Sequence, residues 1–206
     1  MNGEGQAYRD EPALKDLVRK FEEMVQSGDQ AFFDMDELEG LIEHYLGVKE
    51  TRKAEMALKH ARQLYPGHLG LKLRQAQIWA NSGKPVKAVP LLKELLSIDP
   101  HSEEILMTLG SIYSQITEHK QAIDCFKRAL IFADSDARRE IRIDIALEYE
   151  NLGAWKEAIN NLEEALAEDP GNETAVYELA FCFERTGLNN KSVEGIKRAP
   201  TPMLDF

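Results

Sequence analysis

The sequence repeats itself about every 34 residues, and this period constrains the fold more than any other feature. Aromatic residues recur at spacings of 34, 34, 36 and 34 residues, at Tyr45, Trp79, Tyr113, Tyr149 and Phe183. Nine residues after each stands a small residue: Ala54, Ala88, Ala122, Ala158 and Ser192. Four residues further on stands a large apolar residue: Leu58, Leu92, Phe126, Leu162 and Ile196. Such a period is typical of stacked helical units, each of which buries its apolar face only against its neighbours.

The third unit shows the pattern most completely. Leu109-Gly110 is followed by Tyr113, and then by Ala122 and Phe126. This pattern resembles the tetratricopeptide repeat (TPR), a 34-residue helix-turn-helix, and the chain resembles bacterial-type arrays of that repeat. The resemblance covers residues 35–206. It implies an all-α fold, a TPR α-solenoid in which antiparallel helix pairs (helix A, then helix B) stack into a right-handed superhelix with a concave inner surface.

The period also predicts the organisation of the chain. Five repeats are expected at 35–68, 69–102, 103–136, 139–172 and 173–206, with a two-residue insertion around Asp136-Ala137-Arg138. Apolar residues at helical spacing predict an N-terminal capping helix over 11–27, within a capping and linker region of 11–34. Residues 1–10 are expected to form a flexible tail.

Local signals predict how the helices begin, end and pack. Asp34 and Glu37 have the spacing of a capping box at the start of the first repeat. Gly83, Gly153 and Gly187 occupy equivalent positions, as expected for left-handed caps after helix A. Gly110 is small enough to let helix A of the third repeat approach helix B closely.

The resemblance implies that helix A side chains line a concave groove that binds an extended peptide or a partner helix. The predicted groove residues are Glu39, Glu43, Leu73, Gln77, Asn81, Met107, Ser111, Gln115, Ile143, Leu147, Glu150, Asn151, Tyr177, Phe181 and Glu184. Ile143 and Leu147 have an alternative interpretation as core between repeats, because the register can slip by one residue.

Charge indicates what such a groove would bind. The acidic residues on the helix A faces are Asp36, Glu39, Glu43, Glu104, Glu140, Asp144, Glu150 and Glu184. Among the groove positions only Arg185 opposes them, so we expect a basic or neutral ligand with apolar side chains. Charge reversal at Glu43 and Glu150 should weaken binding of a basic peptide. A clamp for a C-terminal carboxylate, as in chaperone-binding TPRs, is not expected, because Arg74 is its only basic candidate.

These features favour a non-catalytic protein-interaction scaffold. The sequence shows no glycine-rich phosphate loop and no zinc-ligand spacing, so no cofactor, metal or enzymatic activity is expected. The five histidines (His44, His60, His68, His101 and His119) are expected at the surface. The chain has 25 basic and 36 acidic side chains, a net charge of −11, which disfavours nucleic-acid binding.

The C-terminal end suggests an alternative function. Pro200 and Pro202 cut the fifth repeat short, and no additional solvating helix follows. Three explanations remain open: the tail folds back, the end forms a homodimer, or the chain is a fragment of a longer array. The alternative function is therefore a structural assembly module that self-associates through its uncapped C-terminal repeat.

The expected compartment is the cytoplasm. Cys125 and Cys182 are predicted to be reduced core residues. The first residues lack a signal-peptide pattern, and no apolar run is long enough for a membrane span.

Overall fold

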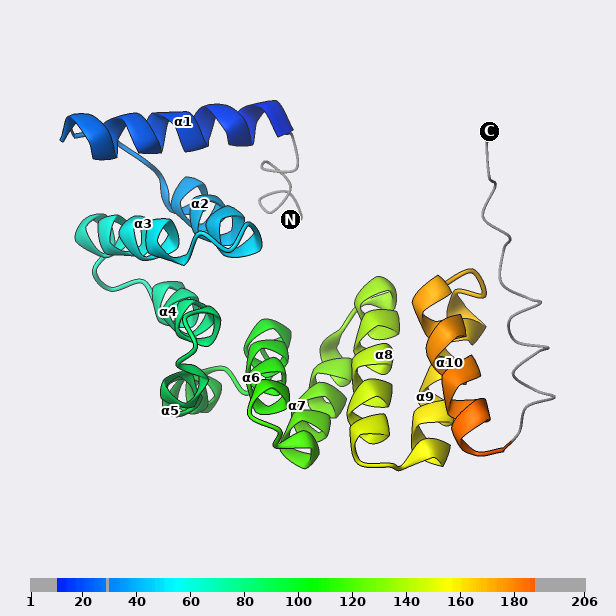
Figure 1. The fold of residues 1–206 in the computed structure, drawn as a ribbon. Helices are drawn as coiled ribbons and strands as arrows, with labels where there is room; N and C mark the ends of the chain where they lie inside the picture. The colour runs from blue at the N-terminus through cyan, green and yellow to red at the C-terminus, as the bar shows by residue number, and fades with distance from the viewer. Residues whose placement is uncertain (1–10, 29, 188–206) are drawn as a thin grey trace, which may run out of the picture. The chain divides into compact units, whose positions relative to one another are not determined.

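The computed structural model describes residues 11–28 and 30–187, and these residues form helices and no strand (Figure 1). The helices are α1 (Glu11–Ser27), α2 (Met35–Gly47), α3 (Thr51–Leu64), α4 (Gly70–Asn81), α5 (Pro85–Ile98), α6 (Glu103–Gln115), α7 (His119–Phe132), α8 (Ser135–Asn151), α9 (Trp155–Glu168) and α10 (Glu173–Arg185). The predicted all-α fold is confirmed. The chain divides into an N-terminal unit, residues 1–95, and a C-terminal unit, residues 96–206, which we describe in turn.

The repeating apolar positions are core positions in both units. The four small residues that the structure describes, at Ala54, Ala88, Ala122 and Ala158, have no exposed surface. The large residues four positions later are at most 3% exposed: Leu58, Leu92, Phe126 and Leu162. Ser192 and Ile196, their counterparts in the fifth repeat, lie outside the described residues. The period of the sequence is therefore a period of burial.

The turns after the A helices repeat with the same period. Gly83, Gly153 and Gly187 have φ angles of 70°, 69° and 77°, as predicted for left-handed caps. At the equivalent positions of the first and third repeats, Lys49 and Thr117 both have φ of 61°. The turn is thus conserved in shape among the repeats even where a side chain makes the left-handed conformation unfavourable.

Gly110 confirms the expected close approach of α6 to α7. A Cβ atom built on Gly110 would lie 2.5 Å from Cε1 of Phe126. The phenylalanine ring fills the space that a side chain at position 110 would need.

Side-chain caps determine where several A helices begin. The Asp34 carboxylate accepts from the backbone N–H of Glu37 (2.7 Å), and the Glu37 side chain accepts from the N–H of Asp34 (2.9 Å), so the predicted capping box is confirmed. Asp134 accepts from the N–H of Ala137 (2.9 Å) at the start of α8. Because α8 has 17 residues, against 13 in α6, the insertion around Ala137 lengthens this helix rather than the loop before it.

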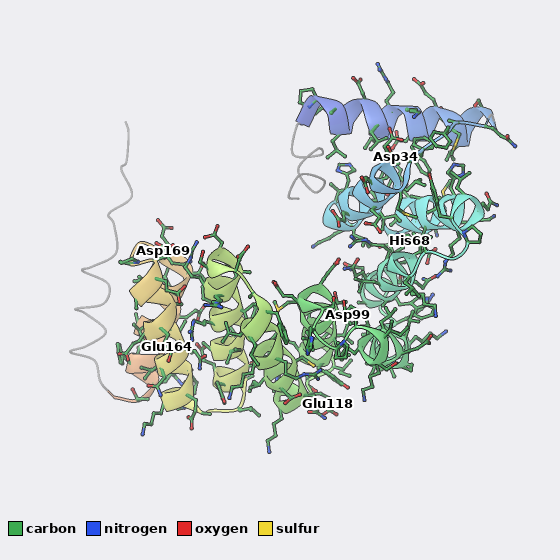
Figure 2. All side chains as sticks on the ribbon, turned by 180° about the vertical axis from the view of Figure 1, so that it is seen from behind. Asp34, His68, Asp99, Glu118, Glu164 and Asp169 are labelled. Atoms are coloured by element: carbon green, nitrogen blue, oxygen red, sulfur yellow. The ribbon has the colours of Figure 1, made fainter. Side chains whose placement is uncertain are left out.

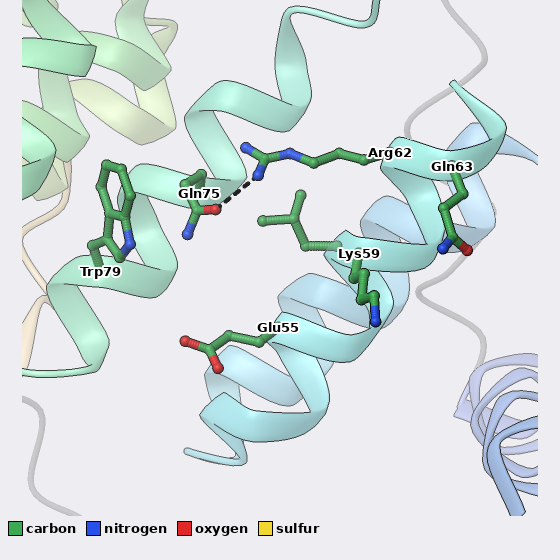
Figure 3. A pocket seen from close by; sticks show the side chains of 7 residues that line it. Glu55, Lys59, Arg62, Gln63, Gln75 and Trp79 are labelled. Carbon is green, nitrogen blue, oxygen red and sulfur yellow. Dashed lines mark hydrogen bonds between the residues drawn. The ribbon is translucent and has the colours of Figure 1, made fainter. Parts of the chain in front are cut away.

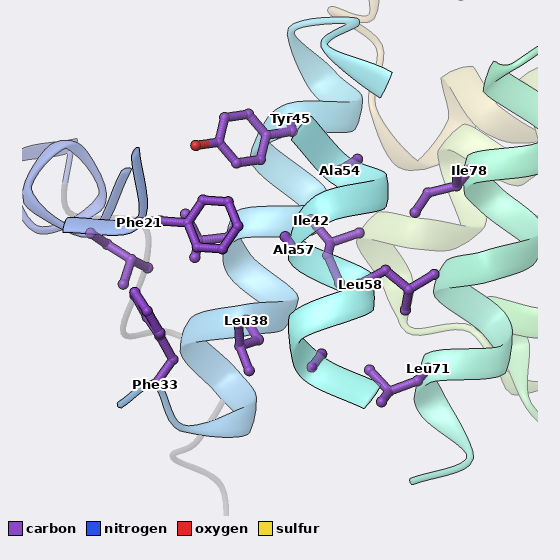
Figure 4. Close-up of a cluster of buried hydrophobic side chains, with 13 residues drawn as sticks. Phe21, Phe33, Leu38, Ile42, Tyr45, Ala54, Ala57, Leu58, Leu71 and Ile78 are labelled. Carbon is purple, nitrogen blue, oxygen red and sulfur yellow. The ribbon is translucent and has the colours of Figure 1, made fainter. Parts of the chain in front are cut away.

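In the N-terminal unit, α1 packs on the first repeat through aromatic residues (Figure 4). The rings of Phe21 and Phe33 meet edge-to-face at 5.8 Å, and Phe21 lies 6.1 Å from Tyr45. Burial and the neighbouring Glu22 carboxylate raise the pKa of Tyr45 to about 12. Lys53 of α3 pairs with the same Glu22 at 2.9 Å. An apolar contact and an ion pair therefore both connect α1 to the helices that follow.

The C-terminal unit holds two clusters of buried residues. One joins α6, α7 and α8 around Leu106, Phe126 and Ile145, and the other joins α8, α9 and α10 around Leu162 and Cys182. No described helix has both the length and the apolarity that crossing a bilayer requires.

Candidate functional site

In the N-terminal unit, the predicted groove carboxylates already have a basic partner. The Arg74 guanidinium lies 2.6 Å from Glu43 and 3.5 Å from Glu39, joining α4 to α2. Arg74 is only 7% exposed, and its Nη1 also donates to the side chain of Gln77 at 3.0 Å. The expectation that only Arg185 opposes the acidic residues is therefore wrong, because sequence position alone did not show that Arg74 lies between these two helices.

The other predicted groove residues of this unit present no exposed apolar side chain. Leu73 is 7% exposed and belongs to the core. The Asn81 side-chain amide donates to the backbone carbonyl of Gln77 at 2.9 Å, so it bonds its own helix. These positions of the N-terminal unit thus keep one net negative charge, because a single guanidinium faces two carboxylates, and they offer no exposed apolar floor.

In the C-terminal unit, the predicted groove residues separate into buried and exposed groups. Ile143 is 4% exposed within the core, and Leu147 and Met107 are partly buried against it, which agrees with the alternative interpretation as core for Ile143 and Leu147. Tyr177 and Phe181 are 62% and 44% exposed on α10. The polar groove residues Ser111, Gln115, Asn151 and Glu184 are exposed, and Glu150 is half-buried.

Two exposed aromatic residues of α10, Tyr177 and Phe181, lie near half-buried Trp155 at the start of α9. The Phe181 ring meets the Trp155 ring edge-to-face, with centroids 6.0 Å apart and planes at 74°. The Arg185 guanidinium lies over the same Trp155 ring, 5.3 Å from its centroid. Tyr177, Phe181 and Arg185 follow one another at intervals of four residues, so they lie along one face of α10. Sequence reasoning missed Trp155, because it stands outside the A helices.

Carboxylates accompany these rings. Glu150 accepts a hydrogen bond from the Cys182 thiol at 3.3 Å, and burial together with the charge of Glu178 raises the Glu150 pKa. Burial and the Glu150 carboxylate raise the pKa of the Cys182 thiol to about 12, so this cysteine stays a thiol at neutral pH. Glu184 lies one turn beyond Phe181 on α10. We call the surface formed by Glu150, Trp155, Tyr177, Glu178, Phe181 and Glu184 the acidic–aromatic surface.

The net charge of the chain is concentrated in the unit that carries this surface. Residues 96–187 hold 19 acidic and 8 basic side chains, a net charge of −11, whereas residues 1–95 hold 15 acidic and 14 basic ones. Asp99, Glu118, Glu164 and Asp169 in Figure 2 are four of the acidic residues in the first range. The potential around the acidic–aromatic surface is therefore negative and attracts cations.

Elsewhere in the C-terminal unit, a buried carboxylate of α8 contacts residues of α6 and α7. Glu148 of α8 is 4% exposed and accepts from the Ser114 hydroxyl at 2.5 Å. Its second oxygen lies 2.6 Å from Nδ1 of His119. One turn earlier on α8, burial and the charges of Glu140 and Glu148 raise the pKa of Asp144 to about 6.

Two histidines are less exposed than expected from the sequence. His119 pairs with buried Glu148, as described above. His60 packs edge-to-face with both the Phe21 and Phe33 rings, with centroids at 6.4 and 5.7 Å, and its Nε2 is buried without a hydrogen-bond partner within the described residues. The expectation of surface positions is wrong for both, because each contacts a residue distant in the sequence. In the part of the chain that the structure describes, no cluster of His, Cys, Asp or Glu could hold a metal ion.

A separate cavity of about 460 Å³ opens between α3 and α4 in the N-terminal unit (Figure 3). Arg62 of α3 donates to the Gln75 side chain of α4 at 3.0 Å along its wall. The lining residues are Glu55, Leu58, Lys59, Arg62, Gln63, Gln75 and Trp79. None of the predicted groove residues is among them, so this cavity is distinct from the acidic–aromatic surface.

Comparison with known proteins identifies the family of the repeat. The family model described as "Tetratricopeptide repeat" matches residues 80–139 and 152–202, more than half of the chain. The TPR repeat-containing protein YpiA of Bacillus subtilis (strain 168) is 25% identical over 135 residues, which is 66% of this chain. The matched region spans only 29% of that protein.

Solved structures share the arrangement of helices. A crystal structure of MamA matches with a TM-score of 0.65 at 23% identity, covering 82% of this chain and 94% of the other. A second crystal structure of MamA matches with a TM-score of 0.63 at 20% identity, covering 89% and 90%. At this level of identity the likeness shows the fold alone.

Proposed function

The chain belongs to the tetratricopeptide repeat family, whose fold serves generally as a protein-interaction scaffold, and we propose that it binds a basic peptide or partner helix through the acidic–aromatic surface. The observation that carries this proposal is the exposure of Tyr177 and Phe181, at 62% and 44%, on α10 beside Trp155. Exposed aromatic residues grouped on one face are typical of protein-binding surfaces.

The charge around these rings defines the proposed ligand. Glu150, Glu178 and Glu184 supply carboxylates, and the surrounding residues 96–187 carry a net charge of −11. A ligand with basic and apolar side chains would satisfy both features, since its cations face the carboxylates while its apolar groups cover the rings. Members of this family are generally non-catalytic, and the proposed binding requires no nucleophile, metal or cofactor.

The N-terminal unit is not part of the proposed peptide surface. Glu39 and Glu43 share the Arg74 guanidinium, and Leu73 is buried. This narrows the interaction expected from the sequence, whose predicted groove residues run from Glu39 to Glu184, to the fourth and fifth repeats.

Fluorescence polarisation with labelled heptapeptides tests the proposal. Two basic probes carry two arginines or two lysines among leucine and alanine residues, and the control probe carries two glutamates instead. We expect at least one basic probe to bind, and the Tyr177→Ala/Phe181→Ala variant to bind it about tenfold more weakly. Ile131→Ala is the matched control, because Ile131 is 68% exposed in the same unit but lies on α7. Equal affinity of the double variant and the wild-type protein, or no binding of either basic probe, would overturn the proposal.

Self-association is the alternative that this experiment must separate. A second copy of the chain that covered the same aromatic residues would compete with the peptide. Light scattering at the concentration used for the titration gives the mass, which is 23.4 kDa for one chain. A mass near twice that value, falling on addition of the basic peptide, would identify the self-association surface with the peptide surface.

A further inference from the structure

The acidic–aromatic surface already holds one cation, supplied by the chain itself. The Arg185 guanidinium lies 5.3 Å from the centroid of the Trp155 ring. The same ring packs against the edge of Phe181, which fixes one side of the indole. Cations bind to the face of a tryptophan through its electron-rich π system, and a planar guanidinium can also stack on it. The geometry of this corner therefore suits an arginine side chain.

The carboxylates around this corner are not used by Arg185. Among the described residues, Arg185 forms no ion pair, and Glu178 and Glu184 have no basic partner within ion-pair distance. The Glu150 carboxylate has the Cys182 thiol as its hydrogen-bond donor, at 3.3 Å. A carboxylate prefers a charged donor to a thiol, and a guanidinium can donate two parallel hydrogen bonds to one carboxylate. Within residues 30–187, the surface thus combines a ring that accepts a guanidinium with carboxylates that have no guanidinium partner.

We propose that the acidic–aromatic surface recognises an arginine side chain of the partner, whose guanidinium replaces that of Arg185 on the Trp155 ring and donates hydrogen bonds to the surrounding carboxylates. This inference rests on the proposed function, since it assigns the chemical class of one side chain in the bound peptide. Arg185 has the role of an internal competitor that covers the ring in the free protein.

Lysine is a poorer ligand for the same place. Its ammonium group is a compact charge that is strongly hydrated, and it has no plane to stack on an indole. Electrostatic attraction to the carboxylates acts on both residues alike. A preference for arginine therefore measures the contribution of the ring and of paired hydrogen bonds separately from net charge.

The two tryptophans of the chain give a direct readout. Trp155 lies in the acidic–aromatic surface and Trp79 lies in the N-terminal unit, so the Trp79→Phe variant reports on Trp155 alone. We expect the arginine peptide to change the emission of this variant and to bind at least fivefold more tightly than the lysine peptide. Circular dichroism melting shows whether Trp79→Phe is folded. If it is not, the arginine-to-lysine affinity ratio is measured by polarisation on the wild-type protein.

Substitutions at Trp155 and Arg185 separate the contribution of the indole ring from the competition by Arg185. Trp155→Leu should reduce the arginine-to-lysine ratio to below twofold while binding of the lysine peptide persists. Arg185→Gln should raise the affinity for the arginine peptide about threefold more than that for the lysine peptide. Arg128→Gln removes an exposed positive charge from α7 of the same unit, and it should change both affinities equally.

The outcomes separate this inference from the proposed function. Equal affinities for the arginine and lysine peptides, or a ratio unchanged in Trp155→Leu, would overturn arginine recognition and leave peptide binding in place. Failure of both peptides to bind would overturn the proposed function together with this inference.

Discussion

Arg74 and Glu43 form a 2.6 Å ion pair that connects α4 to α2, and the two partners differ in burial: the Arg74 side chain is 9% exposed and that of Glu43 is 59% exposed. Arg74 also faces Glu39 at 3.5 Å. The arginine is therefore a structural link between the first two A helices, and its charge is not available to bind a ligand carboxylate.

Removing the Arg74 side chain should lower the free energy of unfolding more than neutralising Glu43. Arg74→Ala removes a buried stem and leaves Glu39 and Glu43 next to each other, so we expect a loss of about 2–3 kcal/mol in the free energy of unfolding. Glu43→Gln should cost less than about 1 kcal/mol, because the carboxylate is largely exposed. Urea unfolding followed by circular dichroism measures both. A larger loss for Glu43→Gln than for Arg74→Ala would contradict the structural role of the arginine.

The same pair changes the prediction for binding. Charge reversal at Glu43 should leave the affinity for the basic peptides within twofold, because Glu43 lies in the N-terminal unit and outside the acidic–aromatic surface. Charge reversal at Glu150 should weaken it about tenfold, because Glu150 belongs to the acidic–aromatic surface. Polarisation titrations compare the two variants. Equal losses would indicate that the N-terminal unit also contacts the peptide.

The left-handed turns predict two stabilising substitutions. Thr117 and Lys49 have φ of 61° at the positions where Gly83, Gly153 and Gly187 stand in the other repeats. Glycine adopts this conformation without a steric penalty, so Thr117→Gly and Lys49→Gly should each raise the free energy of unfolding by about 1 kcal/mol. Gly153→Ala is the reciprocal control and should lower it. A decrease in melting temperature for Thr117→Gly would contradict this account of the turn.

Gly110 predicts a steric effect with a specific rescue. Alanine at position 110 would place Cβ 2.5 Å from the Phe126 ring, and we expect a loss of about 1–3 kcal/mol. The smaller side chain of Phe126→Leu should remove the clash, so the double variant should lose less than the two single losses combined. Thermal melting of the four proteins measures the coupling. Additive losses would show that the loss in Gly110→Ala does not come from contact with the Phe126 ring.

Asp144 predicts a pH dependence of stability. Its pKa is about 6 in the folded protein, whereas an ordinary aspartate, as in the unfolded chain, has a pKa of 3.8. The folded protein therefore binds the proton more tightly than the unfolded chain does. The stabilisation from the protonated form is complete below about pH 4 and is lost as the pH rises through 6. Asp144→Asn should therefore gain more in melting temperature over the wild-type protein at pH 7.5 than at pH 4.5. An equal gain at both pH values would contradict the raised pKa.

The sequence predicted what depends on the repeat and missed what depends on contacts between repeats. Buried Ala122 and Phe126, and the left-handed glycines, follow from spacing within one unit, and every repeat supplies an independent copy of the signal. Three contacts depend on how successive helices meet: the Arg74–Glu43 pair, the packing of His60 against Phe21 and Phe33, and the position of Trp155 beside Phe181. Position in a repeat does not specify those partners.

The groove residues illustrate the same limit. Tyr177 and Ile143 occupy equivalent positions in successive repeats, yet Tyr177 is 62% exposed and Ile143 is 4% exposed. Ile143 is buried in a core cluster with Ala175 and Leu179 of the next A helix, α10, whereas no A helix follows α10 within the described residues. Equivalent positions therefore differ in exposure according to the helix that packs on them.

The central claim is that a basic peptide binds to the C-terminal unit at α10, and amide chemical shifts recorded during titration with the arginine peptide test it most directly. We predict that the largest shifts arise from α10 and the start of α9, around Tyr177, Phe181 and Trp155, and that those of α2 and α4 stay unchanged. The largest shifts in α2 and α4, around Glu43 and Gln77, would contradict the claim.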